Sequence, residues 1–192
     1  QTCALPISAQ AGNAWRAVFQ RTVSDGFRRN VFLGRDDTNG RDETGARLKL
    51  RFGGATGWHG DLELLYADFD NGYDAFAIDN RLDTRSDRPG RDAQQSTAAA
   101  ADFAFPLRGS TEIRSVTTWA DSDVGTSFDG DWGNDRDWGA AGPYDFFSRT
   151  ERDRTNLTQD LRVASTGGGP VSWLAGLWLS RLEETNHMRD DG

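Results

Sequence analysis

The residue types that most often carry catalysis or metal binding are scarce in this sequence. It contains two histidines, His59 and His187, which fall on different predicted strands, and one cysteine, Cys3. A metal centre built from His and Cys needs several such ligands close together, and a catalytic triad needs a nucleophile held beside a histidine. No nucleophile-elbow motif presents a serine for attack. We therefore expect neither an enzyme nor a bound cofactor.

The stretch with the richest chemistry is residues 128–138, FDGDWGNDRDW. It has oxygen ligands enough for Ca²⁺, but it lacks the glycine and the glutamate that an EF-hand loop places at fixed positions. We expect no metal site and interpret the stretch, with Tyr144 beyond it, as a ligand-contact loop of stacking aromatic rings surrounded by charged groups. The alternative is a loop that is merely soluble. The candidate binding residues are Trp132, Trp138, Tyr144, Asp129, Asp131, Asp135, Arg136 and Asp137.

Composition excludes several classes of protein. The 192 residues include 22 basic and 30 acidic side chains, for a net charge of −8. Because the basic residues are scattered singly, they form no concentrated positive surface for nucleic acid. No apolar run approaches the roughly 18 residues of a membrane-spanning helix. The charge and the low aliphatic content would favour disorder, but 7 Trp, 3 Tyr and 11 Phe argue against it.

Hydrophobic periodicity predicts strands. Apolar and polar side chains alternate with a period of two, as in a strand with one apolar face, whereas the three-to-four spacing of helices is rare. The sequence therefore predicts an all-β fold, an antiparallel up-and-down meander of about seven strands. These strands are expected near residues 15–23, 44–52, 58–69, 96–105, 112–119, 157–163 and 172–179.

The connections between these strands alternate in length. Short connections marked by Gly or Pro are expected at 53–57, 106–110 and 165–170, and long ones at 24–43, 70–94 and 121–155. In a meander this alternation puts every tight turn at one end of the sheet and every long loop at the other. Bacterial outer-membrane barrels have this polarity, with short periplasmic turns and long extracellular loops.

The two faces of the predicted strands differ in polarity. One carries Leu, Phe, Trp, Val and Ala, while the other carries charges in mid-strand, including Asp102, Arg114, Asp160 and Arg162. A soluble β-sandwich also alternates, so a soluble carbohydrate-binding module, with sugar held by the aromatic loops, is the second hypothesis. Charges on a buried inward face would count against that sandwich.

Four segments resemble consecutive barrel strands of TonB-dependent outer-membrane receptors. The last of them is similar to a recurring pattern of that family, with Asp160 in place of the more usual Glu and Val163 in place of a second Leu. The likeness spans residues 14–188. The segments are residues 25–30 (DGFRRN), 45–52 (GARLKLRF), 70–76 (DNGYDAF) and 156–165 (NLTQDLRVAS).

The resemblance implies a transport function. It implies a transmembrane barrel of about 22 strands in the outer membrane of a Gram-negative bacterium, surrounded by lipid. A plug inside such a barrel is pulled by the TonB energy-transducing complex, and ferric siderophores are the commonest cargo, with vitamin B12 or glycans as alternatives. The sequence has neither a plug nor a TonB box, so we expect residues 9–192 to be an internal part of the barrel domain.

The first residues are expected to be foreign to the fold. Residues 4–7 (ALPI) read like a translated sequencing adapter, and the start of the chain has no initiator Met and no apolar signal region. We therefore leave residues 1–8 out of the barrel prediction. An ordinary exposed N-terminus is the alternative.

Overall fold

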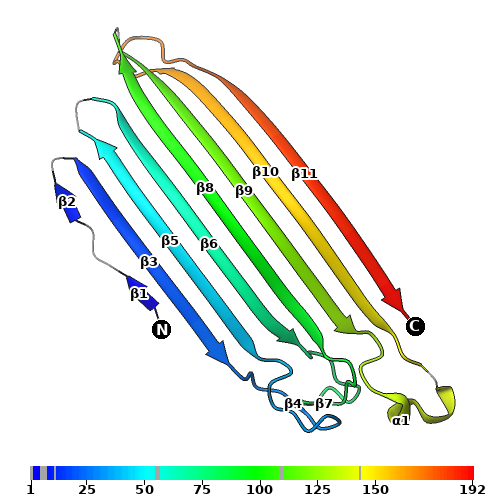
Figure 1. The fold of residues 1–192 in the computed structure, drawn as a ribbon. Coiled ribbons are helices and arrows are strands. Elements are labelled where there is room, and N and C mark those ends of the chain that lie inside the picture. The colour runs from blue at the N-terminus through cyan, green and yellow to red at the C-terminus, as the bar shows by residue number, and fades with distance from the viewer. Residues whose placement is uncertain (1, 5–7, 11, 55–56, 109, 143) are drawn as a thin grey trace.

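The computed structural model describes all residues except 1, 5–7, 11, 55–56, 109 and 143. Its main body is one antiparallel sheet in which each long strand pairs with the next long strand along the chain (Figure 1). The predicted all-β meander of seven long strands is confirmed. The long strands are β3 (Asn13–Ser24), β5 (Arg41–Gly53), β6 (His59–Tyr73), β8 (Gly90–Leu107), β9 (Thr111–Asp129), β10 (Phe147–Ser165) and β11 (Leu174–Asp191).

Short elements lie at the edge and at one end of this sheet. The strands β1 (Thr2–Ala4) and β2 (Ser8–Gln10) pair with the outer edge of β3, so the described part of the N-terminal segment lies against the sheet. Its foreign origin stays a prediction. The other short elements, all in the long connections, are β4 (Arg29–Asn30), β7 (Asp83–Thr84), the helix α1 (Asp135–Trp138) and the 3-10 turn η1 (Gly139–Ala141).

The strands are longer than predicted, and most of the added length lies toward the long loops. Alternation of apolar and polar side chains marks only the part of each strand that has an apolar face. Beyond that part the apolar face ends, yet the backbone pairing continues, with Asp121 opposite Thr155 and Asp123 opposite Asp153. The long connections are therefore residues 25–40, 74–89 and 130–146, and the wider predicted bounds were wrong.

The predicted alternation of short and long connections is confirmed. The tight turns that join β5 to β6, β8 to β9 and β10 to β11 lie at one end of the sheet, and the three long loops lie together at the other (Figure 1). Residues 55–56 and 109, in two of these turns, are outside the described part of the chain.

Register places the two chemical classes of side chain on opposite faces. Leu50 lies opposite both Trp15 and Leu62, and Leu62 lies opposite Ala101, so these four share the apolar face. The charged side chains stand at the neighbouring positions of the same strands, so they point to the opposite face of the sheet. There they pair across and along strands, with nitrogen–oxygen distances of 2.7 Å for Arg51–Asp61, 2.8 Å for Arg114–Asp102 and 2.9 Å for Arg162–Asp160.

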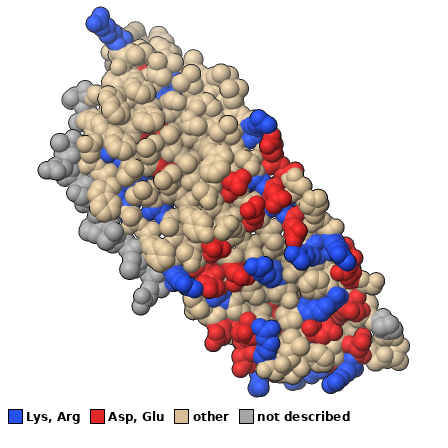
Figure 2. All heavy atoms as spheres, in the orientation of Figure 1, with Lys and Arg blue, Asp and Glu red and all other residues tan. Residues whose placement is uncertain are grey.

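Charge is also distributed unevenly along the strands. Figure 2 shows mostly uncharged atoms over the half of the sheet near the tight turns, and acidic and basic groups gathered over the half near the long loops. On the face that carries Leu50, the row Phe19, Ala46 and Tyr66 is followed two residues further along by Arg21, Thr44 and Asp68. The apolar band therefore ends near Tyr66, and the strands continue beyond it with polar surfaces.

In the described part of the chain, no second sheet covers the apolar face. Among the described residues, Ala104 is the one buried hydrophobic residue, while Leu64 and Trp119 on the apolar face are 52% and 38% exposed. A soluble sandwich would bury one face of this sheet against a partner layer, so the single layer disfavours the carbohydrate-binding alternative. Within the described residues, no helix is long and apolar enough to cross a bilayer.

Candidate functional site

The three long loops form the candidate site because they meet at one end of the sheet (Figure 1). We call them loop 1 (residues 25–40), loop 2 (74–89) and loop 3 (130–146). Each is anchored on two neighbouring long strands. Loop 2 lies between the others in the chain and contacts both of them.

Loops 1 and 2 are joined by a buried polar network. The short strands β4 and β7 pair in parallel, and at their centre Asn30 and Thr84 are fully buried. The Asn30 amide donates to Asp74 Oδ2 at 2.9 Å, and the Thr84 hydroxyl donates to the same oxygen at 2.6 Å. Asn30 also donates to the Ser86 carbonyl at 2.8 Å. Since buried polar groups are costly when unpaired, this network fixes the two loops relative to each other.

Loops 2 and 3 are joined by backbone, charged and aromatic contacts. The Asp87 N–H donates to the Gly133 carbonyl at 3.1 Å, and the Asn134 amide donates to the Arg85 carbonyl at 2.9 Å. Arg85 also pairs with Asp137 at 2.9 Å. These contacts, with the network between loops 1 and 2, make the three loops one packed unit.

Asp131 organises the interior of loop 3. It is 3% exposed, and its carboxylate accepts hydrogen bonds from the Gly133 N–H at 2.9 Å, the Phe146 N–H at 3.0 Å and the Trp138 indole at 3.4 Å. Asp129, at the end of β9, is also buried and accepts from the Asp131 N–H at 3.2 Å. These two predicted binding residues thus face the interior of the loop and hold its shape.

The other predicted binding residues lie nearer the surface. Trp132 is 43% exposed and Tyr144 is 47% exposed, and Asp135 and Arg136 on α1 are exposed as well. Trp138 is partly buried, with its ring edge-on to Tyr144 at 5.4 Å between centroids. Asp137 is engaged by Arg85 and by the amide of Asn134. Of the eight, Trp132, Tyr144, Asp135 and Arg136 have exposed side chains that a ligand could reach.

Sequence reasoning missed the aromatic residues that loops 1 and 2 bring to loop 3. The ring of Phe76 stacks on Trp132, with 5.2 Å between centroids and 17° between planes. Tyr73 meets Phe76 edge-on at 5.9 Å, and the Arg136 guanidinium lies over Phe32 at 5.6 Å. Phe76 stood in a segment that carried the family resemblance, but nothing in the sequence pairs it with Trp132.

Electrostatics in this region are dominated by carboxylates. Burial raises the pKa of Asp129 from its ordinary 3.8 to about 6, and the neighbouring charges of Asp131 and Asp87 add to the increase. Burial also raises the pKa of Asp87, helped by Asp145 and Asp131. Among the described residues, no group of three or more His, Cys, Asp or Glu side chains could hold a metal ion.

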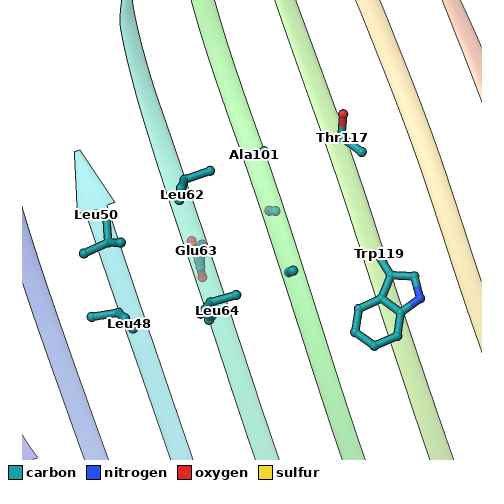
Figure 3. A pocket seen from close by; sticks show the side chains of 10 residues that line it. Leu48, Leu50, Leu62, Glu63, Leu64, Ala101, Thr117 and Trp119 are labelled. Carbon is teal, nitrogen blue, oxygen red and sulfur yellow. The ribbon is translucent and has the colours of Figure 1, made fainter. Parts of the chain in front are cut away.

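A separate apolar hollow lies on the sheet, away from the loops. It has a volume of about 220 Å³ and follows β8, where the small side chains of Ala99 and Ala101 lie between larger ones. Figure 3 shows Leu62 and Leu64 on one side and Trp119 on the other, with Glu63 behind the sheet on the charged face. With no polar atoms converging on it, this groove belongs to the apolar band rather than to a site of chemistry.

Comparison with known proteins identifies the class of fold. No protein-family model matches the sequence, and no curated protein matches it. Among solved structures, the chain is similar to the ferric yersiniabactin uptake receptor FyuA from Yersinia pestis, with a TM-score of 0.76 and 16% sequence identity. The match covers 99% of this chain and 29% of that receptor chain. The fold of this chain is therefore similar to that of a portion of the solved receptor chain.

The buried network between loops 1 and 2 predicts the effect of removing its acceptor. Asp74→Ala would remove the acceptor that the buried Asn30 amide and Thr84 hydroxyl share, and each lost bond to a buried group costs about 1–3 kcal/mol. We expect amide hydrogen exchange at Val31, whose N–H bonds the Thr84 carbonyl, to speed up by about tenfold or more. Asp74→Asn, whose amide oxygen can still accept, is the matched control. Equal exchange in Asp74→Ala and wild type would contradict the assignment.

The buried carboxyl of Asp129 predicts a pH dependence. Because its pKa is about 6 in the folded state and 3.8 ordinarily, the folded state binds the proton more tightly, and stability falls as pH rises through this interval. Asp129→Asn removes the cost of burying a negative charge and keeps an oxygen that accepts from the Asp131 N–H. We expect thermal unfolding in detergent micelles to show the variant more stable than wild type at pH 8 and not at pH 4. Asp135→Asn, at an exposed position, is the control; a gain that is independent of pH would refute the explanation.

Proposed function

We propose that the chain is part of an outer-membrane receptor that takes up a ferric siderophore with energy from the TonB complex. In this proposal the seven long strands are one section of the barrel wall, and loops 1 to 3 are extracellular. The observation that carries it is the combination of two faces of opposite polarity with tight turns at one end and a packed loop unit at the other.

The dimensions of the apolar band support the membrane assignment. A tilted strand crosses a bilayer in about 9–11 residues, whereas β8 has 18 residues and β9 has 19. The part of β9 near its tight turn, up to Trp119, has the apolar face, and from Asp121 onward that face carries polar residues and glycine. Trp119 and Tyr66 lie at the end of the band, where aromatic side chains of membrane barrels gather.

The charged face then lines the inside of the barrel. Its ion pairs, such as Arg51–Asp61 and Arg114–Asp102, would be unfavourable against lipid but are compatible with a water-filled lumen or a polar plug. A plug, a TonB box and contact with TonB are part of the proposal because the chain spans only 29% of the receptor it is similar to. The role proposed is transport, not catalysis.

The cargo assignment rests on the loops and on the comparison. The similar receptor is named for uptake of ferric yersiniabactin, and loops 2 and 3 of this chain present exposed aromatic rings. A ferric chelate offers organic surface for such rings, whereas carboxylates without a fixed ligand set hold bare Mg²⁺ or Ca²⁺ weakly. A ferric siderophore is therefore the cargo proposed.

The orientation in the membrane is tested by labelling intact cells that carry the whole receptor. A cysteine at the exposed position Asp135 on α1 should react with a membrane-impermeant thiol reagent, and one at Gly168 in the tight turn between β10 and β11 should not. The receptor without an added cysteine gives the background from Cys3. The reverse pattern would invert the orientation.

The function is tested by uptake of radiolabelled iron in iron-starved cells. Deleting the gene of the whole receptor should abolish uptake of at least one chelate from a panel of ferric hydroxamates, catecholates and aryl-containing chelates. Uptake should return with the wild-type gene and should fail in a strain without TonB. Unchanged uptake of every chelate, together with no binding by the purified receptor, would overturn the proposal.

A further inference from the structure

Trp132 has a backbone conformation that large side chains rarely adopt. Its φ is 64°, and it is one of three non-glycine residues with positive φ in the described part of the chain. Strain of this kind persists only where the surroundings impose it, and it concentrates at ligand-binding sites. Here the carboxylate of Asp131 imposes it through its bonds to the N–H groups of Gly133 and Phe146.

The conformation places the indole of Trp132 in a row of aromatic rings. Phe76 stacks on Trp132 at 5.2 Å, and Tyr73 meets Phe76 edge-on at 5.9 Å. We call these three residues the aromatic platform. Trp132 is 43% exposed, Phe76 38% and Tyr73 37%. More than a third of each residue is exposed, so the platform offers flat apolar surface to an external group.

The platform adjoins the charged face of the sheet. Tyr73 is the last residue of β6 and, by strand alternation, lies on the same face as Glu63, which pairs with Arg47 and Lys49. That face lines the lumen in the proposed receptor. The platform therefore stands at the mouth of the lumen, where cargo has to enter.

The loops offer little to an anionic cargo. Loops 1 to 3 contain eleven acidic and seven basic residues. Five of the seven arginines are paired with aspartates within the loops, and in the remaining two the guanidinium lies over a ring, Arg28 over Phe27 and Arg136 over Phe32. The five pairs are Arg29–Asp36, Arg35–Asp37, Arg81–Asp79, Arg85–Asp137 and Arg88–Asp145.

We propose that the aromatic platform binds a flat aromatic group of a cargo that is neutral or cationic, and that the receptor discriminates against polyanionic chelates. Stacking on Trp132 supplies affinity for the ring. The acidic excess repels a chelate with several negative charges, since like charge across an interface suppresses wrong partners. This inference rests on the proposed function and specifies its substrate class.

Calorimetry on the whole purified receptor in detergent tests the inference with three ferric chelates. The first is neutral and carries an aryl ring, the second is a neutral trihydroxamate without one, and the third is a trianionic tricatecholate. We expect the wild type to bind the aryl chelate more tightly than either of the others, by about tenfold or more.

Substitutions of Trp132 distinguish the contribution of its ring to binding from the effect of its strained backbone. Trp132→Gly removes the ring and relieves the positive φ, so the loop should be at least as stable as in wild type by thermal unfolding. It should nevertheless lose about tenfold or more in affinity for the aryl chelate, with about twofold or less change for the trihydroxamate. Trp132→Phe should keep most of the wild-type affinity for the aryl chelate. Trp173→Ala, in the tight turn at the opposite end, should leave the affinity for every chelate unchanged.

Two results would overturn the inference and leave the proposed function standing. In the first, the wild-type receptor binds the tricatecholate more tightly than the other two chelates. In the second, Trp132→Gly loses the same affinity for all three chelates. If no chelate binds to the wild-type receptor and uptake is unaffected by its deletion, the proposed function itself fails.

Discussion

The antiparallel register between the long strands is the constraint on which the rest of this structure depends. Once Leu50 lies opposite Leu62, and Arg51 opposite Asp61, every second residue of those strands is committed to the apolar face and the others to the charged face. A slip of one residue would expose the ion pairs on the apolar side. The same register carries all tight turns to one end and all long loops to the other, so the position of the loop unit follows from it.

The long strands also explain how loops of modest length form a defined site. Because β9 and β10 remain paired up to Asp129 and Phe147, loop 3 starts from a fixed base well beyond the apolar band. Several polar side chains of the loops do not face water but form hydrogen bonds in the interior. Asn30, Asp74 and Thr84 satisfy one another in the interior, and this leaves aromatic rings at the surface.

Buried aspartates in the loops illustrate how structure is maintained at an energetic cost. Asp129 is buried near other carboxylates, and burial, with the charges of Asp131 and Asp87, raises its pKa. Asp131 is better satisfied, with three donors, and it holds Trp132 in a strained conformation. Locally unfavourable groups at an exposed surface are typical of sites that bind a ligand.

The sequence alone determined the seven strands, their two faces and the alternation of short and long connections, because each depends on a local period of two or on turn residues. It did not determine where the strands end, since pairing continues into segments that are polar on both faces, such as residues 148–156 of β10. Nor could it place Phe76 on Trp132 or bury Asp129 and Asp131. Those outcomes were decided by tertiary structure because they depend on contacts between loops that are distant in the chain, and no local pattern encodes such contacts.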